Sequence, residues 1–114
     1  MPAAKSTPPA PAGKLSRDQL IEEVIAVLRR HDGRAEKDVV IAEVYRRNRK
    51  LFDTPYYQQP TGPHRTRWRH QVEWARNDAK DRGLIKPPAE SGRGMWELTL
   101  RGHNWGGSDD RADS

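Results

Sequence analysis

Apolar residues recur at helical spacing in three successive segments of this 114-residue chain and then change to alternate spacing in a fourth. Apolar residues three and four positions apart share one face of a helix, whereas alternate residues share one face of a strand. A chain of this length holds one small hydrophobic core. The pattern therefore predicts a mainly α-helical domain with a small β-hairpin, in the order of three helices followed by two strands.

The first helical segment carries signals at both of its ends. Ser16 and Gln19 fit a capping box at the start, and Leu15 precedes them as a hydrophobic staple would. Asp32 and Gly33 supply a stop at the other end. Between these signals, five apolar residues lie at helical spacing, namely Leu20, Ile21, Val24, Val27 and Leu28. These features predict a helix that packs one face on the core.

A second helical pattern covers residues 36–48, with Val40 and Val44, joined by Ile41 and Tyr45, on its apolar side. It ends in basic residues that suit the helix dipole and are also candidates for DNA backbone contacts, namely Arg46, Arg47, Arg49 and Lys50. Residues 51–63 then hold three Pro, two Tyr and one Gly. This composition predicts an ordered loop between the second and third helices.

The third helix is expected to start near Pro63 and to end at Gly83. Its apolar stripe consists of Trp68, Val72, Ala75 and Ala79. Beyond Leu84 and Ile85, a glycine-containing turn at residues 91–94 precedes a segment of alternating character at residues 95–100. We expect a β-hairpin there, with Trp96, Leu98 and Leu100 on its buried face.

The two ends of the chain have a different composition from the middle. Residues 1–14 are rich in Pro and Ala, and residues 106–114 contain three Asp against one Arg, so both are expected to be disordered tails around a domain at residues 15–105. The chain has no Cys, which excludes disulfides and thiolate chemistry. We find neither a signal peptide nor an apolar run of about 20 residues, so a cytoplasmic protein is expected.

Three helices followed by a hairpin is the order of a winged helix-turn-helix, in which the hairpin is called the wing. In that architecture the third helix enters the major groove of double-stranded DNA, and the wing touches the neighbouring backbone. The strongest supporting signal is the segment from His64 to His70, which holds three Arg and two His without an acid. Arg neutralises phosphates and pairs with guanine, although a solvated basic face is the plainer interpretation.

The candidate DNA-binding residues lie on the third helix and at the hairpin. Opposite the apolar stripe of the helix lie Arg67, His70, Trp74 and Asn77. Trp74 suits either stacking on an unpaired base or packing against the hairpin or the long loop, and we favour packing. Lys86 and Arg93 flank the hairpin, as phosphate contacts or as ordinary surface charge. The full set is His64, Arg65, Arg67, Arg69, His70, Gln71, Trp74, Asn77, Lys86 and Arg93.

The second half of the chain resembles a known family. The residues concerned are Val72-Glu73-Trp74-Ala75-Arg76, Gly83-Leu84-Ile85, Arg93-Gly94-Met95-Trp96-Glu97-Leu98-Thr99 and Gly102. Over about residues 20–102 the chain is similar to the N-terminal winged-helix domain of Mrr-like restriction proteins. The resemblance implies DNA binding and sensing of modified bases, in bacterial or phage restriction-modification or transcription regulation. The family's usual Asn-Arg before the Val is His70-Gln71 here, so its base preference is not carried over.

No enzyme, cofactor or metal site is expected. The chain has no nuclease domain of the kind that Mrr-like proteins carry, and no catalytic set or phosphate loop can be assembled. His64 and His70 are six residues apart, off a common helical face, and lack a third ligand. Two other functions stay open. One is a protein-interaction module that uses Phe52, Tyr56 and Tyr57 in residues 51–60, and the other is a single-stranded nucleic-acid binder. The sequence does not indicate the oligomeric state.

Overall fold

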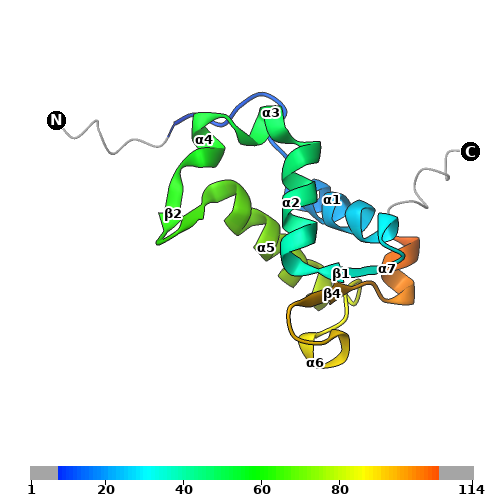
Figure 1. Cartoon of the computed structure of the whole chain (residues 1–114). Coiled ribbons are helices and arrows are strands. Elements are labelled where there is room, and N and C mark those ends of the chain that lie inside the picture. The colour runs from blue at the N-terminus through cyan, green and yellow to red at the C-terminus, as the bar shows by residue number, and fades with distance from the viewer. Residues whose placement is uncertain (1–7, 106–114) are drawn as a thin grey trace, which may run out of the picture.

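The computed structural model describes residues 8–105 and is a winged helix, as predicted (Figure 1). Its centre consists of α1 (Arg17–Arg30), α2 (Lys37–Arg47) and α5 (Arg67–Asp81), each packed against the other two. A small antiparallel sheet of β1 (Arg34–Glu36) and β4 (Met95–Glu97) lies beside them. None of the helices within the described residues has both the length and the apolar character that crossing a membrane requires.

The capping box at the start of α1 is confirmed. The Ser16 hydroxyl accepts a hydrogen bond from the Gln19 backbone NH at 3.1 Å, and the Gln19 side chain accepts one from the Ser16 NH at 2.8 Å. Two of the otherwise unsatisfied NH groups of the first turn are thereby bonded. All five predicted core residues of α1 are buried, and Asp32 and Gly33 turn the chain at its end with φ of 59° and 93°.

The sheet differs from the prediction in the main partner of β4. Residues 84–86 do run antiparallel to the chain after β4, with a bridge between Ile85 and Leu98 and a 2.9 Å hydrogen bond from Lys86 NH to the Glu97 carbonyl. The longer ladder, however, joins β4 to β1, where Ala35 lies opposite Trp96. The three-residue strand β1 was not predicted because Arg-Ala-Glu offers a single apolar residue. Helix α6 (Pro88–Ser91) lies within the wing loop.

Leu100 was expected on the buried face of the hairpin, and this prediction is wrong because its side chain is 79% exposed. The chain leaves the sheet after Leu98 and forms α7 (Leu100–Asn104). Thr99 starts this helix, since its hydroxyl accepts a hydrogen bond from the Gly102 NH at 3.0 Å. Arg29 of α1 donates to the His103 carbonyl at 2.9 Å and so holds the far end of α7.

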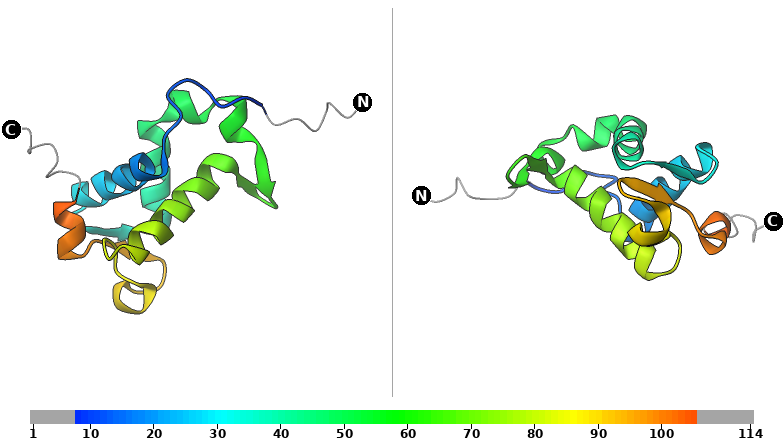
Figure 2. Two further views of the ribbon diagram at one scale, coloured as in Figure 1. Left: turned by 180° about the vertical axis from the view of Figure 1, so that it is seen from behind. Right: turned by 60° about the horizontal axis from the view of Figure 1, so that its bottom comes forward.

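Residues 51–63 were predicted to be a loop, and this is wrong because they contain regular structure. Two short helices, α3 (Arg49–Phe52) and α4 (Pro55–Gln58), precede a second hairpin of β2 (Pro60–Gly62) and β3 (Arg65–Thr66). Pro63 lies in the turn of that hairpin, so the third helix begins at Arg67 and not near Pro63. Figures 1 and 2 show this hairpin and α6 beyond opposite ends of α5.

Residues 49–66, which lie between α2 and α5 and are called the insertion below, are ordered by an aromatic cluster. The ring of Phe52 lies 4.9 Å from that of Tyr57 and 5.6 Å from that of Trp68, measured between centroids. Tyr45 lies 4.9 Å from Trp68 and extends the cluster onto α2. Phe52 and Tyr57 are both 0% exposed. They therefore belong to the core and are not free to contact a protein partner, whereas Tyr56, the third residue of that hypothesis, is half-buried.

The ends of the described range are attached to the domain in specific ways. The Leu15 backbone NH donates to the Tyr57 hydroxyl at 3.1 Å, and the ammonium group of Lys14 lies 5.8 Å from the centroid of the Tyr56 ring. Residues 8–14 form neither helix nor strand. The predicted tail at residues 106–114 and the first half of the tail at residues 1–14 lie outside the described residues.

Candidate nucleic-acid interface

Helix α5 has a buried face and an outward face, as its apolar stripe predicted. Val72, Ala75 and Ala79 are buried against the core, and Trp68 is half-buried on the same side. On the opposite side Trp74 is 56% exposed, beside His70 and Asn77. The predicted packing of Trp74 against the hairpin or the long loop is therefore wrong. The outward face of α5 is open in the described part of the chain.

Two arginines at the start of α5 converge on one carboxylate. The Arg65 Nε lies 3.5 Å from one oxygen of Glu73, and the Arg69 Nε lies 3.6 Å from the other. Arg69 also reaches Asp38 of α2 at 3.2 Å, although the Asp38 side chain is 79% exposed. Ion pairs this exposed contribute about 0–1 kcal/mol. A phosphate can therefore compete with Asp38 for Arg69.

Arg67 has a structural role that the sequence did not indicate. Its Nε donates to the Tyr56 carbonyl at 3.0 Å, and one terminal nitrogen donates to the Gln59 side chain at 2.5 Å. The guanidinium carbon lies 4.4 Å from the centroid of the Tyr56 ring. Arg67 thus attaches the insertion to the start of α5, which differs from the DNA contact expected of it.

His70 and Trp74 form a connected pair on the outward face. The indole NH of Trp74 donates to Nε2 of His70 at 2.5 Å, and the planes of the two rings are 23° apart. The other ring nitrogen of His70 lies 3.2 Å from the hydroxyl of Thr61, in the second hairpin. Since Nε2 accepts, the neutral ring carries its proton on Nδ1 and donates to Thr61. The hairpin thereby fixes the orientation of an exposed tryptophan.

The predicted wing residues have different surroundings. The ammonium group of Lys86 lies 3.0 Å from a carboxylate oxygen of Glu97, whose other oxygen lies 3.6 Å from Nε of Arg34. Arg93 is exposed between Gly92 and Gly94, which have φ of 98° and 73°, and it has no ion pair with any of residues 8–105. His64 is likewise exposed at the tip of the other hairpin, with φ of 59°.

Arg76, which is not among the candidate DNA-binding residues, lies at the contact between α5 and the wing. Its guanidinium carbon lies 5.7 Å from the centroid of the Trp96 ring, between α5 and the wing, and its Nε is buried without a hydrogen-bond partner. One terminal nitrogen lies 3.4 Å from the side-chain oxygen of Asn77. Burial lowers the pKa of Arg76 from its ordinary value. In the sequence Arg76 belongs to the residues that carry the family resemblance, but its role was not predicted, because its surroundings come from the wing, 20 residues further along.

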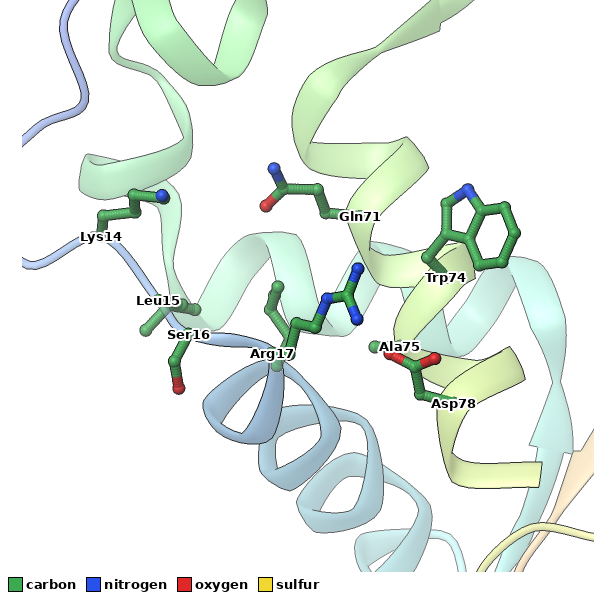
Figure 3. Close-up of a pocket in the computed structure, with 9 residues that line it drawn as sticks. Lys14, Leu15, Ser16, Arg17, Gln71, Trp74, Ala75 and Asp78 are labelled. Atoms are coloured by element: carbon green, nitrogen blue, oxygen red, sulfur yellow. The ribbon is translucent and has the colours of Figure 1, made fainter. Parts of the chain in front are cut away.

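Gln71 faces a cavity that also receives residues from outside α5 (Figure 3). Lys14 and Arg17, which the sequence analysis did not select, line this cavity together with Trp74 and Asp78. A second hollow, lined by residues 46–51, follows the basic end of α2. There Arg47 pairs with Glu23 at 2.8 Å and Arg46 with Glu43 at 3.8 Å. Within the described range, no three His, Asp or Glu side chains are arranged to hold a metal ion.

The model of the Mrr N-terminal domain family matches residues 18–107, which are most of the chain. Neither the curated proteins nor the solved structures include a protein that matches this chain.

Proposed function

Because this chain belongs to the Mrr N-terminal domain family, we propose that it binds double-stranded DNA with α5 in the major groove and the wing on the adjacent backbone. The observation that carries the proposal is the presence of partly or fully exposed arginines before, on and after α5. His64 and Arg65 lie in the hairpin before the helix, Arg69 lies on its first turn, and Arg93 lies in the wing between α6 and β4. We expect these arginines to contact the phosphates that flank the groove.

The dimensions of α5 suit this role. Its 15 residues span about 22 Å, and the major groove of B-DNA, about 12 Å wide, admits one helix. The acids Asp78 and Asp81 lie in the C-terminal half, where they oppose the approach of phosphate. The N-terminal half, which holds Arg67 and Arg69 and has no Asp, is therefore the part that we expect to enter the groove.

The candidate residues divide into two groups by chemistry. Arg65, Arg69, Lys86 and Arg93 have charged groups that suit phosphates, which provide most of the affinity and none of the sequence information. His70, Gln71 and Asn77 have side-chain donors and acceptors that suit base edges. Recognition of a modified base, which the family resemblance implies, would fall to this second group.

The proposal is tested by measuring duplex binding at two salt concentrations. We expect affinity to fall steeply with salt, and the triple variant Arg65→Ala, Arg69→Ala, Arg93→Ala to bind at least tenfold more weakly at low salt, with a shallower salt dependence. Arg67 stays unchanged because it holds the insertion. The double variant Arg30→Ala, Arg101→Ala is the control, since it removes exposed cations that have no place in the proposed interface. Equal affinity of the wild type and the first variant, both folded by circular dichroism, would contradict the groove assignment.

The same assay addresses the remaining parts of the proposal. Plain and methylated duplexes of one sequence are compared, and a difference in affinity of tenfold or more would identify a reader of modified DNA. We also propose that the chain acts by binding, as an accessory factor in restriction or transcription, and not as an enzyme. Supercoiled plasmid incubated with the protein and Mg²⁺ should stay intact, and nicking that is absent from the Arg65, Arg69, Arg93 variant would contradict this part.

A further inference from the structure

A cavity of about 310 Å³ lies between the start of α1 and the middle of α5 (Figure 3). Leu15, Leu20 and Ala75 give it an apolar lining. Polar side chains surround that lining, with Lys14 and Arg17 from the α1 side and Gln71 and Asp78 from α5. This volume lies at the lower end of the range for small-molecule sites. The cavity adjoins the outward face of α5 because Trp74 belongs to both.

The polar groups around this cavity are available to a ligand. Among residues 8–105, the side chains of Arg17, Gln71 and Asp78 have no hydrogen-bond or ion-pair partner. Their neighbours on α5 differ, since Arg69 and Glu73 pair with each other. In Figure 3 the Arg17 guanidinium points across the cavity toward α5, with Gln71 on one side and Asp78 on the other. A cation, an amide and a carboxylate thus face one space.

Trp74 adds a flat surface whose orientation is fixed. More than half of its side chain is exposed, yet its NH is bonded to His70, which the hairpin holds through Thr61. An exposed indole that is held in one orientation loses little freedom when a planar ring stacks on it. Stacking of a nucleic-acid base on an aromatic side chain contributes several-fold to over a hundredfold in affinity.

We infer that this cavity binds one unstacked nucleotide, with its base against Trp74 and its phosphate beside Lys14 and Arg17. The inference rests on the proposed function and adds to it a site for a nucleotide that has left the base stack. Gln71 provides both a donor and an acceptor for the base edge, whereas the Asp78 carboxylate only accepts. Asp78 therefore favours bases with an exocyclic amino group, such as adenine and cytosine, over thymine.

Charge and shape together favour this ligand over others. The two cations and one carboxylate give the site a net charge of +1, which suits a single phosphodiester and disfavours a cation. A simple anion would make no use of the flat surface of Trp74. An uncharged aromatic ligand would make no use of the charges of Lys14 and Arg17. The nucleotide can come from a single strand or from a duplex position that has lost its pairing, and both present the same chemistry.

The test compares three labelled probes, namely a perfect duplex, the same duplex with one bulged adenine, and a single strand. We expect the wild type to bind the bulged duplex about tenfold more tightly than the perfect one. This preference should fall to about twofold or less in Trp74→Ala and in Arg17→Ala, and should be largely kept in Trp74→Phe. A bulged thymine should give a smaller preference than adenine, and Asp78→Asn should reduce that difference. Arg30→Ala removes a charge of the same kind from the other end of α1 and is the control.

Each outcome decides for or against the site. Equal binding of bulged and perfect duplexes by the wild type overturns the inference and leaves the proposed function standing. A preference that persists in both Trp74→Ala and Arg17→Ala also overturns it, because the unpaired nucleotide then lies elsewhere. If no duplex binds but the single strand binds and depends on Trp74 and Arg17, the inference stands and the proposed function fails. If none of the three probes binds, both fail.

Discussion

At the scale of single residues, Trp74 and Trp96 have the same chemistry and opposite surroundings. Trp96 is 4% exposed between β1 and Arg76, whereas Trp74 is 56% exposed. We predict that Trp96→Ala lowers the free energy of unfolding by about 3–5 kcal/mol, since it removes a large buried ring. Trp74→Ala should lower it by less than about 1 kcal/mol. Urea unfolding followed by circular dichroism measures both, and similar midpoints for the two variants would contradict the burial described here.

Gly102 and Gly94 are a second pair of identical residues, and the cost in stability of replacing each by Ala depends on its surroundings. A Cβ on Gly102 would lie 2.0 Å from the Leu84 carbonyl oxygen, whereas one on Gly94 would meet nothing within 4 Å. Gly94→Ala suffers only from its positive φ and should cost about 1–2 kcal/mol. Gly102→Ala forces α7 away from the backbone at Leu84, so we predict a larger loss, about 3 kcal/mol or more. Thermal unfolding of the two variants gives the order, and the reverse order would mean that α7 docks differently.

At the scale of elements, Glu23 joins α1 to α2. It accepts hydrogen bonds from Arg47 at 2.8 Å and from Asn48 at 3.0 Å. Burial raises the pKa of Glu23, but these two hydrogen bonds outweigh burial and leave the pKa below its ordinary value. Since the folded-state pKa lies below the unfolded one, the contribution to stability is present above about pH 4.3 and is lost as pH falls through the folded-state value.

We therefore predict that Glu23→Gln destabilises the domain at pH 7 and that the difference from wild type shrinks at about pH 3. The loss at pH 7 should be modest, because the side chain is partly exposed. Glu22→Gln changes an exposed neighbour and serves as the control. Urea midpoints at the two pH values measure the effect. A difference that does not change with pH would show that the ionised carboxylate is not its source.

At the scale of the whole molecule, charge distribution sets long-range attraction for DNA. The chain has a net charge of +5, although residues 106–114 hold three Asp against one Arg. We predict that deletion of residues 106–114 strengthens duplex binding several-fold at low salt and has little effect at high salt, since screening acts over about 10 Å at 0.1 M. Deletion of residues 1–13, which removes only Lys5 as a side-chain charge, should weaken it slightly. A difference that persists at high salt would require direct contacts.

Across the whole molecule, the elements that the sequence could predict are those that depend on local features of the chain. Helical spacing and end signals predicted α1, α2 and α5, because both are local properties of the chain. The insertion and β1 were missed, since their order depends on contacts between distant residues, such as Phe52 with Trp68 and Ala35 with Trp96. The basic segment before and within α5 was found from composition. Arg17 and Arg76 were not predicted as site residues. Arg17 is brought to the cavity by α1, and Arg76 is placed beside the wing only by tertiary packing.

The pairing of β1 with β4 also determines when this protein can finish folding during its synthesis. Arg34 pairs with Glu97, and the Leu98 NH donates to the Gly33 carbonyl, so strands separated by more than 60 residues close the sheet. Contacts this distant carry a large loop-closure entropy and slow the rate-limiting step of folding. A ribosome-bound chain that lacks the wing can form α1, but it cannot cover Ala35 or close the sheet. The domain should therefore fold in a single late step, and a chain truncated before Met95 should be a target for proteolysis.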